Sequence, residues 1–491
     1  MKKLLFYIGG DWVPSANGEW APVFSPSTGA VIAETAMGSS EDVERAVAAA
    51  EHAKASFARL PLMERARLLH AIADALAADL DDIAHDLALE QGKPFQTEAR
   101  REVQAAIKMW HDSAEDCKRI QGEVLPSTDP AKRILTFHQP RGIYAVITPW
   151  NFPLTVPTEH LCAALAAGNT VVWKPSEYTP LTAYNMLRCA EQAGLPPGVL
   201  NCVVGLGSAV GAPLVSHSQV NGVALTGSSE TGERVARAAG AKAMLLELGG
   251  NGPTIIFDDA DVETAIARTA YGCWANAGQI CDSTERILVQ RSVHERVVAG
   301  LVKSAKEVRL GLSLESETTM GPLNNQPVAD KVDRHVQDAL AKGADILTGG
   351  RRAAGFDTPL FYEPTVIDRV TPDMLLNQEE TFGPVAPVLV FDDDDEALAL
   401  ANNCRLGLAA GVFTSNVARA FYLTEQLEMG VVNINETCAY WQSHTPFGGY
   451  SGKRSGLGRL GGKYGILEMS QIKTMVIDLK NAAGGSRCYS P

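Results

Sequence analysis

The sequence predicts an α/β protein whose parallel β-sheets are covered by helices on both faces. Short β-branched runs such as "GIYAVITPW" and "NTVVWKPS" each end in Gly, Pro or Ser, and helix-length segments such as 180–194 and 229–240 separate them. After "LLELGGNGPTIIF" (245–257) the alternation starts again and runs to about residue 430. Continuous apolar strands that alternate with helices are typical of buried parallel sheets. We therefore expect two α/β domains.

Length and charge exclude several classes of function. The chain has 491 residues, enough for two or three domains, and its 43 basic and 57 acidic residues give a net charge of −14. An acidic surface repels nucleic acid phosphates and anionic lipids, so we expect neither as a partner. The apolar run after Met1 stops at Gly9, and no stretch is long enough for a membrane span. We expect a cytoplasmic protein.

The N-terminal region predicts helices. Residues 39–59 carry apolar side chains at helical spacing, with Ser39 or Ser40 as the cap and acidic residues in the first turn. The same pattern continues over 62–90 and ends at "QGKP", where Gly92 and Pro94 cannot extend a helix.

Two further segments have the alternating pattern of strands without neighbours in sequence. These are "AKRILTFHQ" (131–139) and "SQIKTMVIDLK" (470–480). Such strands need a sheet edge to pair with. The pattern predicts subunit association, with an edge strand inside one chain as the alternative.

Nine cysteines are scattered without regular spacing and without a Cys-x-x-Cys pair. The odd number argues against a disulfide framework, and the spacing argues against a zinc site, so we expect no metal. Most of these thiols are expected to be small buried residues in a reducing compartment. "GQICDSTE" (278–285) raises the question of whether Cys281 is one of them or a nucleophile.

Three strand ends carry groups that suit a nucleotide. "VVWKPSE" places Lys174 and Glu177 where a lysine can donate to ribose or phosphate and a carboxylate can accept from ribose hydroxyls. A carboxylate there repels a 2′-phosphate and so favours NAD over NADP. "ALTGSSETG" and "VVGLGSAVG" add glycine-rich turns, although neither is a strict G-x-G-x-x-G and tight turns without a ligand remain the alternative.

Taken together, the motifs resemble the NAD(P)-dependent aldehyde dehydrogenase superfamily from about residue 5 to 480. The motifs that carry the resemblance occur in the family's order: "PWNFP" (149–153), "GNTVVWKPSEYTP" (168–180), "TGSSETG" (226–232), "LELGGNGP" (246–253), "GQICDS" (278–283), "EETFGPV" (379–385) and "PFGGYSGKRSGLGR" (446–459).

The resemblance implies an aldehyde dehydrogenase-like α/β fold with three parts. These are a Rossmann-like NAD-binding domain, an α/β catalytic domain and a small β oligomerisation ribbon, with a homodimer or homotetramer as the assembly. The residues implied are 1–120 and 141–249 for the NAD-binding domain, 250–447 for the catalytic domain, and 121–140 and 468–491 for the oligomerisation segments.

The resemblance also implies a reaction, in which an aldehyde is oxidised to the carboxylic acid through a thiohemiacetal and a thioester. Cys281 matches the nucleophile, because a thiolate attacks well near neutral pH and later leaves well. Asn151 and the backbone N–H of Cys281 match the donors to the oxyanion. Glu247 matches the general base of hydrolytic deacylation, and its apolar neighbours predict a raised pKa if it is buried. Lys174 is assigned a supporting role in catalysis.

By the same resemblance, NAD is the expected cofactor, with Glu380 on the nicotinamide ribose and Phe382 against its ring. The full set of expected cofactor contacts is Trp150, Lys174, Ser176, Glu177, Gly207, Gly227, Ser228, Gly232, Leu248, Glu380 and Phe382. The two glycines after Leu248 are expected to let the chain pass close to the cofactor.

The substrate is less well determined by the sequence than the reaction or the cofactor. The residues expected near the aldehyde are Phe152, Ile280, Asp282, Ser283, Trp441, Gln442, His444 and Phe447. No arginine stands out as a clamp for a carboxylate, and Asp282 disfavours anionic groups close to the carbonyl. We expect a small to medium aldehyde with polar or aromatic character, and a semialdehyde remains open.

Two alternatives have different functions. Relatives that transfer the acyl group to coenzyme A generally lack a glutamate at the position of Glu247, so this residue favours hydrolysis over a CoA-acylating semialdehyde dehydrogenase. A non-catalytic structural relative is the other alternative, and the intact Cys281, Glu247 and Asn151 argue against it.

Overall fold

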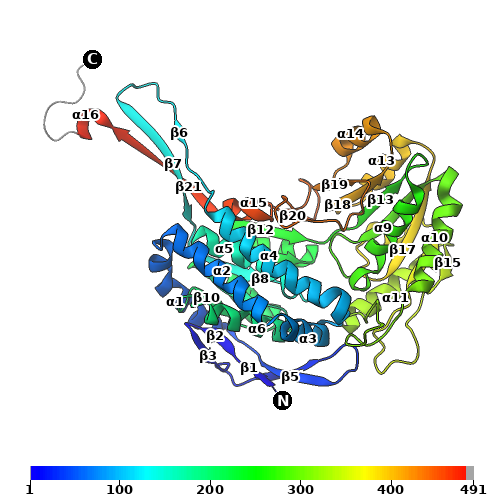
Figure 1. Ribbon diagram of the computed structural model, residues 1–491, viewed down its shortest axis with the longest axis horizontal. Helices are drawn as coiled ribbons and strands as arrows, with labels where there is room; N and C mark the ends of the chain where they lie inside the picture. The colour runs from blue at the N-terminus through cyan, green and yellow to red at the C-terminus, as the bar shows by residue number, and fades with distance from the viewer. Residues whose placement is uncertain (1, 483–491) are drawn as a thin grey trace.

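The computed structural model describes residues 2–482. It holds two large sheets and two three-stranded sheets, with helices around the large ones (Figure 1). Residues 483–491 of the expected oligomerisation segment 468–491, with Cys488, lie outside the described residues.

The first large sheet has eight strands and a parallel centre. In spatial order its strands are β20 (Gly456–Leu457), β12 (Ala243–Leu248), β11 (Val220–Gly227), β8 (Ile143–Ile147), β9 (Thr170–Lys174), β10 (Leu200–Cys202), β2 (Phe6–Ile8) and β3 (Asp11–Val13). The five strands from β12 to β10 are parallel to one another. Strand order reverses between β8 and β11, which is where sheets of this kind bind ligands.

Helices cover both faces of this sheet because successive residues of its buried strands point to opposite sides. In β8, Tyr144 and Val146 pack into one core, and Ile143 and Ala145 pack into the other. Helices on the first side are α2 (Leu62–Ala78), α3 (Leu80–Gln91), α4 (Arg100–Cys117), α5 (Thr155–Ala167), α6 (Pro180–Gln192) and α15 (Gly462–Glu468). Helices on the second side are α1 (Ser40–Ala58), α7 (Ala212–Ser216) and α8 (Ser229–Ala239).

The N-terminal helices follow the sequence. Ser39 is the N-cap residue of α1, and its backbone N–H donates to Asp42 Oδ2 at 3.1 Å. The helical pattern over 62–90 forms two helices, divided at Asp79, which leaves the helical region at φ −104° and ψ 19°. A short polar residue tolerates that conformation and can begin the next helix. The second helix ends at Gly92 with φ +101°, the left-handed cap that the glycine predicted.

The second large sheet has seven strands. In spatial order they are β15 (Asp345–Thr348), β16 (Thr365–Asp368), β17 (Val385–Phe391), β14 (Thr284–Gln290), β13 (Gly252–Ile256), β18 (Ala409–Phe413) and β19 (Val431–Ile434). All neighbours are parallel except β15 and β16. The helices around it are α9 (Val262–Trp274), α10 (His294–Glu307), α11 (Gln326–Ala341), α12 (Leu375–Gln378), α13 (Asp394–Asn402) and α14 (Val417–Gln426).

The chain returns to the first sheet near its end. The boundary expected at 249/250 falls between β12 and β13, the last and first long strands of the two sheets. Strand β20 lies in residues 448–467, which none of the expected domain segments included, and it pairs antiparallel with β12 through Leu246 and Leu457. The chain therefore joins the two sheets twice, once between β12 and β13 and again where it returns from the second sheet to pair β20 with β12.

The two separate ribbon segments pair with each other. Strand β7 (Lys132–Pro140) is antiparallel to β21 (Ser470–Asp478), and β6 (Val124–Leu125) adds a short third strand. This ribbon projects from the body of the molecule, with α16 (Leu479–Ala482) at its end (Figure 1). Apolar side chains on it are exposed, among them Val124 (74%), Ile472 (67%) and Val476 (56%).

The remaining sheet is formed near the N-terminus by β1 (Lys2–Leu4), β5 (Val31–Ala36) and β4 (Trp20–Phe24). None of the helices between residues 2 and 482 is long and apolar enough to cross a lipid bilayer.

Candidate active site

Cys281 and Glu247 open onto one cavity of about 280 Å³. The cavity lies between the two halves of the molecule, because its walls come from α4 and α5 on one side and from the segment before β14 on the other. Five of the predicted substrate-pocket residues line it: Phe152, Ile280, Asp282, Trp441 and Phe447.

Three other residues of that set lie elsewhere. His444, which the sequence placed in the substrate pocket, is exposed and does not line the cavity. Gln442 is also exposed and donates to Tyr440 Oη, and Ser283 is buried with its hydroxyl on Glu285 Oε1 at 3.3 Å. In the loop around Trp441, the side chains of Ala439, Trp441 and Phe447 line the cavity, whereas Tyr440 is exposed. The sequence of the loop does not show which of its side chains point inward.

A left-handed turn presents Cys281 to the cavity. Asn276 (φ +49°), Ala277 (φ +53°) and Gly278 (φ +73°) follow one another in this conformation, which costs energy for the two residues that are not glycine. At Gly278 a Cβ atom would lie 2.1 Å from the carbonyl oxygen of Gly383, so only glycine fits. The buried carboxyl of Glu98 accepts the backbone N–H of Asn276 at 3.0 Å and helps to hold the turn.

A buried ion pair holds the loop that carries Asn151. Lys93 Nζ lies 2.6 Å from Glu102 Oε2 and donates to the Asn151 carbonyl at 3.0 Å. Glu102 Oε1 accepts the backbone N–H groups of Leu154 and Thr155, at 2.9 and 3.2 Å. Local sequence patterns did not reveal Lys93 and Glu102, because each lies far along the chain from the loop that it fixes.

Asn151 itself is buried, with an exposed fraction of 5%. Its Nδ2 donates to the Gln279 carbonyl at 3.1 Å, which leaves the second N–H of the amide available. Within the described chain, the backbone N–H of Cys281 donates to no protein acceptor. Both groups predicted to stabilise an oxyanion therefore have a free donor.

The cavity is a strongly acidic environment for a thiol. The pKa of Glu247 is raised to about 8, mainly by burial and to a smaller extent by the nearby charges of Asp282 and Glu380, while a hydrogen bond with Cys281 acts in the opposite direction. Burial also raises the pKa of the Cys281 thiol well above its usual range, with Glu247 and Asp282 as the next causes. The sequence predicted the raised pKa of Glu247 from its leucine neighbours, and its cause is the predicted one.

Cys281 differs from the other cysteines in its exposure. All eight cysteines within residues 2–482 are free thiols, and seven of them are buried. Cys281 is the only one of the eight that is half-buried and lines this cavity. A substrate must be able to reach a nucleophile, so exposure distinguishes Cys281 from the seven buried cysteines.

The predicted cofactor residues gather at the carboxyl edge of the eight-stranded sheet. Lys174 ends β9, and its Nζ lies 3.3 Å from Glu177 Oε2. Ser228 is the N-cap of α8 and accepts the N–H of Thr231, and Gly207 has nothing within 4 Å of the Cβ position. Lys174 does not line the cavity around Cys281 and lies instead among the residues that the sequence predicted to contact the cofactor.

The remaining members of the set have structural contacts of their own. Ser176 accepts the backbone N–H of Tyr178 at 3.2 Å. Gly232 allows Leu248 to pack against α8, since a Cβ there would lie 2.4 Å from Leu248 Cδ1. Gly227 ends β11 with no atom closer than 4.0 Å to its Cβ position, which leaves room above the strand end.

Phe382 and Glu380 approach the same edge from the other half of the molecule. Phe382 has φ +59°, and its ring packs edge-on against Trp150 with centroids 5.6 Å apart. The buried carboxyl of Glu285 accepts the N–H groups of Thr381 (2.5 Å) and Phe382 (2.8 Å) and so fixes this loop. Glu285 directly continues the "GQICDST" run, but nothing in the sequence shows which loop it holds.

The two glycines after Leu248 leave room for other residues of the site. Gly249 makes room for Glu380, because a Cβ atom at this position would lie 3.0 Å from Glu380 Oε2. A Cβ atom at Gly250 would lie only 2.1 Å from the carbonyl oxygen of Cys281. Gly250 also donates its N–H to Glu380 Oε1 at 3.1 Å. Their close neighbours are therefore site residues of the protein.

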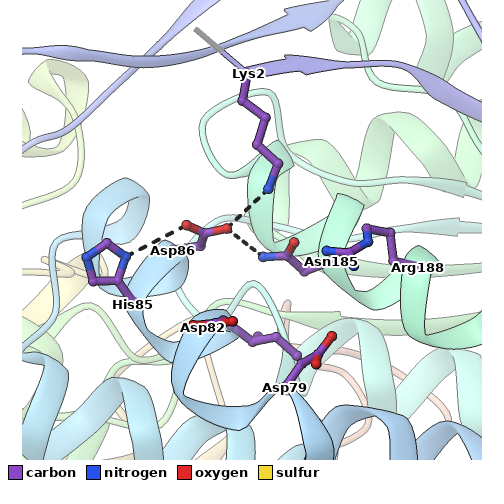
Figure 2. A pocket seen from close by; sticks show the side chains of 8 residues that line it. Lys2, Asp79, Asp82, His85, Asp86, Asn185 and Arg188 are labelled. Carbon is purple, nitrogen blue, oxygen red and sulfur yellow. Dashed lines mark hydrogen bonds and ion pairs between the residues drawn. The ribbon is translucent and has the colours of Figure 1, made fainter.

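A second cavity of about 300 Å³ offers no comparable chemistry. It lies between α3, α6 and the N-terminal strand, where Lys2 Nζ (3.4 Å) and Asn185 Nδ2 (2.9 Å) both reach Asp86 Oδ2 (Figure 2). It contains no cysteine and shares no residue with the cavity of Cys281. Its contacts tie the N-terminal strand to the body of the molecule.

Comparison with known proteins agrees with this geometry. The model of the aldehyde dehydrogenase family matches residues 12–475. The chain is 40% identical to the mitochondrial succinate-semialdehyde dehydrogenase of Oryza sativa subsp. japonica, over 95% of this chain and 88% of the relative.

Solved structures are similar over their whole length. A crystal structure of an NADP-dependent enzyme from E. coli has a TM-score of 0.94 at 37% identity, covering 97% of this chain and 98% of that one. Betaine aldehyde dehydrogenase from Staphylococcus aureus in complex with NAD+ has a TM-score of 0.94 at 35% identity, covering 97% and 95%. This chain belongs to the aldehyde dehydrogenase family, and its reaction is the oxidation of an aldehyde to the carboxylic acid with NAD or NADP.

Proposed function

We propose that the protein is an NAD-dependent aldehyde dehydrogenase that hydrolyses its acyl intermediate, with Cys281 as the nucleophile and Glu247 as the general base. The observation that carries the proposal is the cavity that Cys281 and Glu247 share. Cys281 is the only half-buried thiol within the described residues, and Glu247 is a buried carboxyl with a pKa of about 8. Asn151 Nδ2 and the Cys281 N–H supply the donors beside them.

The first half of the reaction forms a bond to sulfur. Glu247, in its ionised form, takes the proton of the Cys281 thiol, and the thiolate attacks the aldehyde carbon. The carbonyl electrons move to oxygen, where Asn151 and the Cys281 N–H stabilise the oxyanion of the thiohemiacetal. Bound NAD supplies the acceptor for the hydride that leaves when this oxyanion collapses to the thioester.

The second half returns the thiol. Glu247 first releases the thiol proton to solvent and then takes a proton from water, the resulting hydroxide attacks the thioester carbon, and the bond from carbon to Cys281 Sγ breaks. The acid leaves and the sulfur regains a proton. Because the same carboxyl serves both halves, its ionisation controls the overall rate, and activity rises with pH through the pKa of about 8.

The cofactor preference is proposed from the strand ends. Lys174 and Glu177 form a pair at the carboxyl end of β9, where ribose hydroxyls can bind both groups. The open Cβ position of Gly207 and the start of α8 at Ser228 fit a pyrophosphate. The carboxylate of Glu177 supports NAD over NADP, because it repels a 2′-phosphate.

The exposed apolar side chains of the ribbon support a homo-oligomer, because a free two- to three-stranded ribbon leaves an unpaired edge. Eight free thiols in the described chain support a reducing compartment such as the cytoplasm.

A single experiment tests the chemistry. Purified protein with an aldehyde and NAD is quenched with acid during turnover and digested, and the peptide that contains Cys281 is analysed by mass spectrometry. We expect an acyl adduct on Cys281 that accumulates in Glu247→Gln, since its hydrolysis is slowed. Turnover without any adduct in either protein contradicts the covalent mechanism.

A comparison of kcat/KM with NAD and with NADP, in the wild type and in Glu177→Gln, tests the cofactor assignment. Equal values for the two cofactors in the wild type contradict it.

A further inference from the structure

Two carboxyls of the active-site cavity have no part in the reaction described above. Asp282 lines the cavity with an exposed fraction of 6%, and its carboxyl receives a hydrogen bond only from its own backbone N–H. Glu159 projects from α5 into the same cavity. Within residues 2–482, its carboxyl forms no ion pair and no hydrogen bond to another side chain. Asp282 is buried and Glu159 is half-buried. Polar groups in the wall of an interior cavity normally have partners, so the lack of a side-chain partner at both positions points to a ligand.

Two other carboxyls of the cavity have contacts with the protein. Glu102 is paired with Lys93 at 2.6 Å, and one oxygen of Glu98 accepts the N–H of Asn276, whereas Glu98 Oε2 is buried and has no hydrogen-bond partner within the described residues. Arg101 is the only cationic side chain that lines the cavity, and it is exposed on α4. Glu159, Asp282 and the general base therefore form a group of carboxyls that has no cationic partner among the described side chains.

Aromatic rings form the rest of the wall. Phe152, Tyr271, Trp441 and Phe447 line the cavity, and Trp441 packs edge-on against Phe447 with centroids 6.5 Å apart. Ring faces attract cations, and a combination of rings and carboxylates is the usual recognition site for ammonium groups.

The ionisation of these carboxyls agrees with that pattern. Burial raises the pKa of Asp282 to about 7 and the pKa of Glu159 well above its usual range, and the charges of Glu247 and Asp282 add to the rise at Glu159. A cation between Glu159 and Asp282 favours their ionised forms, whereas a carboxylate tail would face them with like charge.

We propose that the substrate is an aldehyde whose tail carries a protonated or quaternary amine, held by Glu159, Asp282 and the aromatic wall. The inference rests on the proposed function, in which the carbonyl of the same molecule reaches Cys281. It gives the chain a specificity that differs from the carboxylate-bearing aldehyde in the name of its rice relative.

Three aldehydes, of which the first two are matched in size and shape, test the inference with the full-length enzyme and NAD. The first is butanal with a trimethylammonium group on its terminal carbon, the second has a tert-butyl group in its place, and the third is succinate semialdehyde. We expect kcat/KM for the cation to exceed that for the neutral isostere by about tenfold or more, because the quaternary ammonium is attracted by the ring faces and by the ionised carboxylates. Succinate semialdehyde is expected to be the poorest of the three.

Substitution then shows whether the carboxyl is responsible. The readout is the ratio of kcat/KM for the ammonium aldehyde to kcat/KM for its tert-butyl isostere, which cancels effects on the chemical steps. In Glu159→Gln we expect this ratio to fall at least about tenfold. Glu425→Gln, an exposed position on α14, is the matched control and is expected to keep the wild-type ratio.

The outcomes separate the two proposals. If none of the three aldehydes is oxidised and no acyl adduct forms on Cys281, the proposed function fails. If the neutral isostere is oxidised but the cation is not preferred, or if Glu159→Gln leaves the ratio unchanged, only the substrate inference fails. Highest kcat/KM for succinate semialdehyde, lost in Arg101→Gln, would identify Arg101 as an anion clamp and overturn the inference.

Discussion

The two sides of the active site are held in place in different ways. On the cofactor side, Lys174, Glu177 and Ser228 lie at strand ends and helix starts, and their closest polar partners are within three residues in sequence. On the nucleophile side, the turn before Cys281 and the loop of Asn151 are held by Glu98, Glu102 and Lys93 from distant segments. The strand-end part of the cofactor side is organised locally, whereas the nucleophile side and the loop of Phe382 are held by buried long-range contacts.

This difference predicts different responses to substitution. A locally held residue can be changed without disturbing the rest of the site, whereas loss of a buried charge leaves its partner unpaired. We therefore expect cofactor-side variants to change affinity and nucleophile-side variants to change both stability and turnover. The following experiments test the contrast, beginning with the largest effect.

Removal of the nucleophile is expected to have the largest effect. Cys281→Ala should lower kcat by at least about 10⁴-fold, because no other group can form the thioester. Formation of reduced cofactor gives the rate, and circular dichroism shows that the variant is folded. Cys189→Ala removes a buried thiol whose pKa burial raises to about 12, and it should retain activity. Substantial turnover by Cys281→Ala would exclude covalent catalysis by this residue.

Loss of the general base comes next. Glu247→Gln should lower kcat by about 10²–10⁴-fold and abolish its rise with pH. The wild type must lose the Glu247 proton before it can act, so its kcat should increase with an apparent pKa of about 8. Rapid mixing should still show a first burst of reduced cofactor if hydrolysis is the slowed step. A wild-type profile that is flat between about pH 6 and about pH 9, a range that spans the raised pKa of about 8, would contradict the role of Glu247.

The buried ion pair tests the long-range side directly. Lys93→Met leaves Glu102 buried without its cation, and we expect a loss of about 3–5 kcal/mol in the free energy of unfolding. Glu102→Gln keeps an acceptor for the Leu154 and Thr155 N–H groups and should cost less. Urea denaturation measures both, and kcat should fall with stability because Asn151 shifts. Equal stability of Lys93→Met and the wild type would show that the pair does not hold the loop.

Two glycines give the smallest effects and the closest contrast. Gly278→Ala forces a Cβ to within 2.1 Å of the Gly383 oxygen at φ +73°, so we expect a cost of about 1–3 kcal/mol and reduced kcat. Gly207→Ala meets no atom within 4 Å and should change stability by less than about 0.5 kcal/mol. Its expected effect is a severalfold higher KM for NAD. The reverse order of the two effects would remove the distinction between the sides.

The same distinction between local and long-range contacts explains which features could be predicted from the sequence. Strand ends, helix caps and glycine turns depend on neighbouring residues, so Glu177, Ser228 and the cap at Gly92 were predictable from local patterns. The helix break at Asp79 and the outward position of His444 depend on packing that local patterns do not contain. Glu285 and the pair of Lys93 and Glu102 could not be predicted, because their partners are distant in the chain.

Strand β20 has a practical consequence for dividing the chain. A fragment that ends after Leu248 would expose the edge of β12 to which residues 456–457 pair, and would also lack the strand 470–478 that covers β7. Neither half is therefore complete when expressed alone. Coexpression of the pieces 1–249 and 250–491 should yield a reassembled enzyme, with each piece aggregating in the absence of the other.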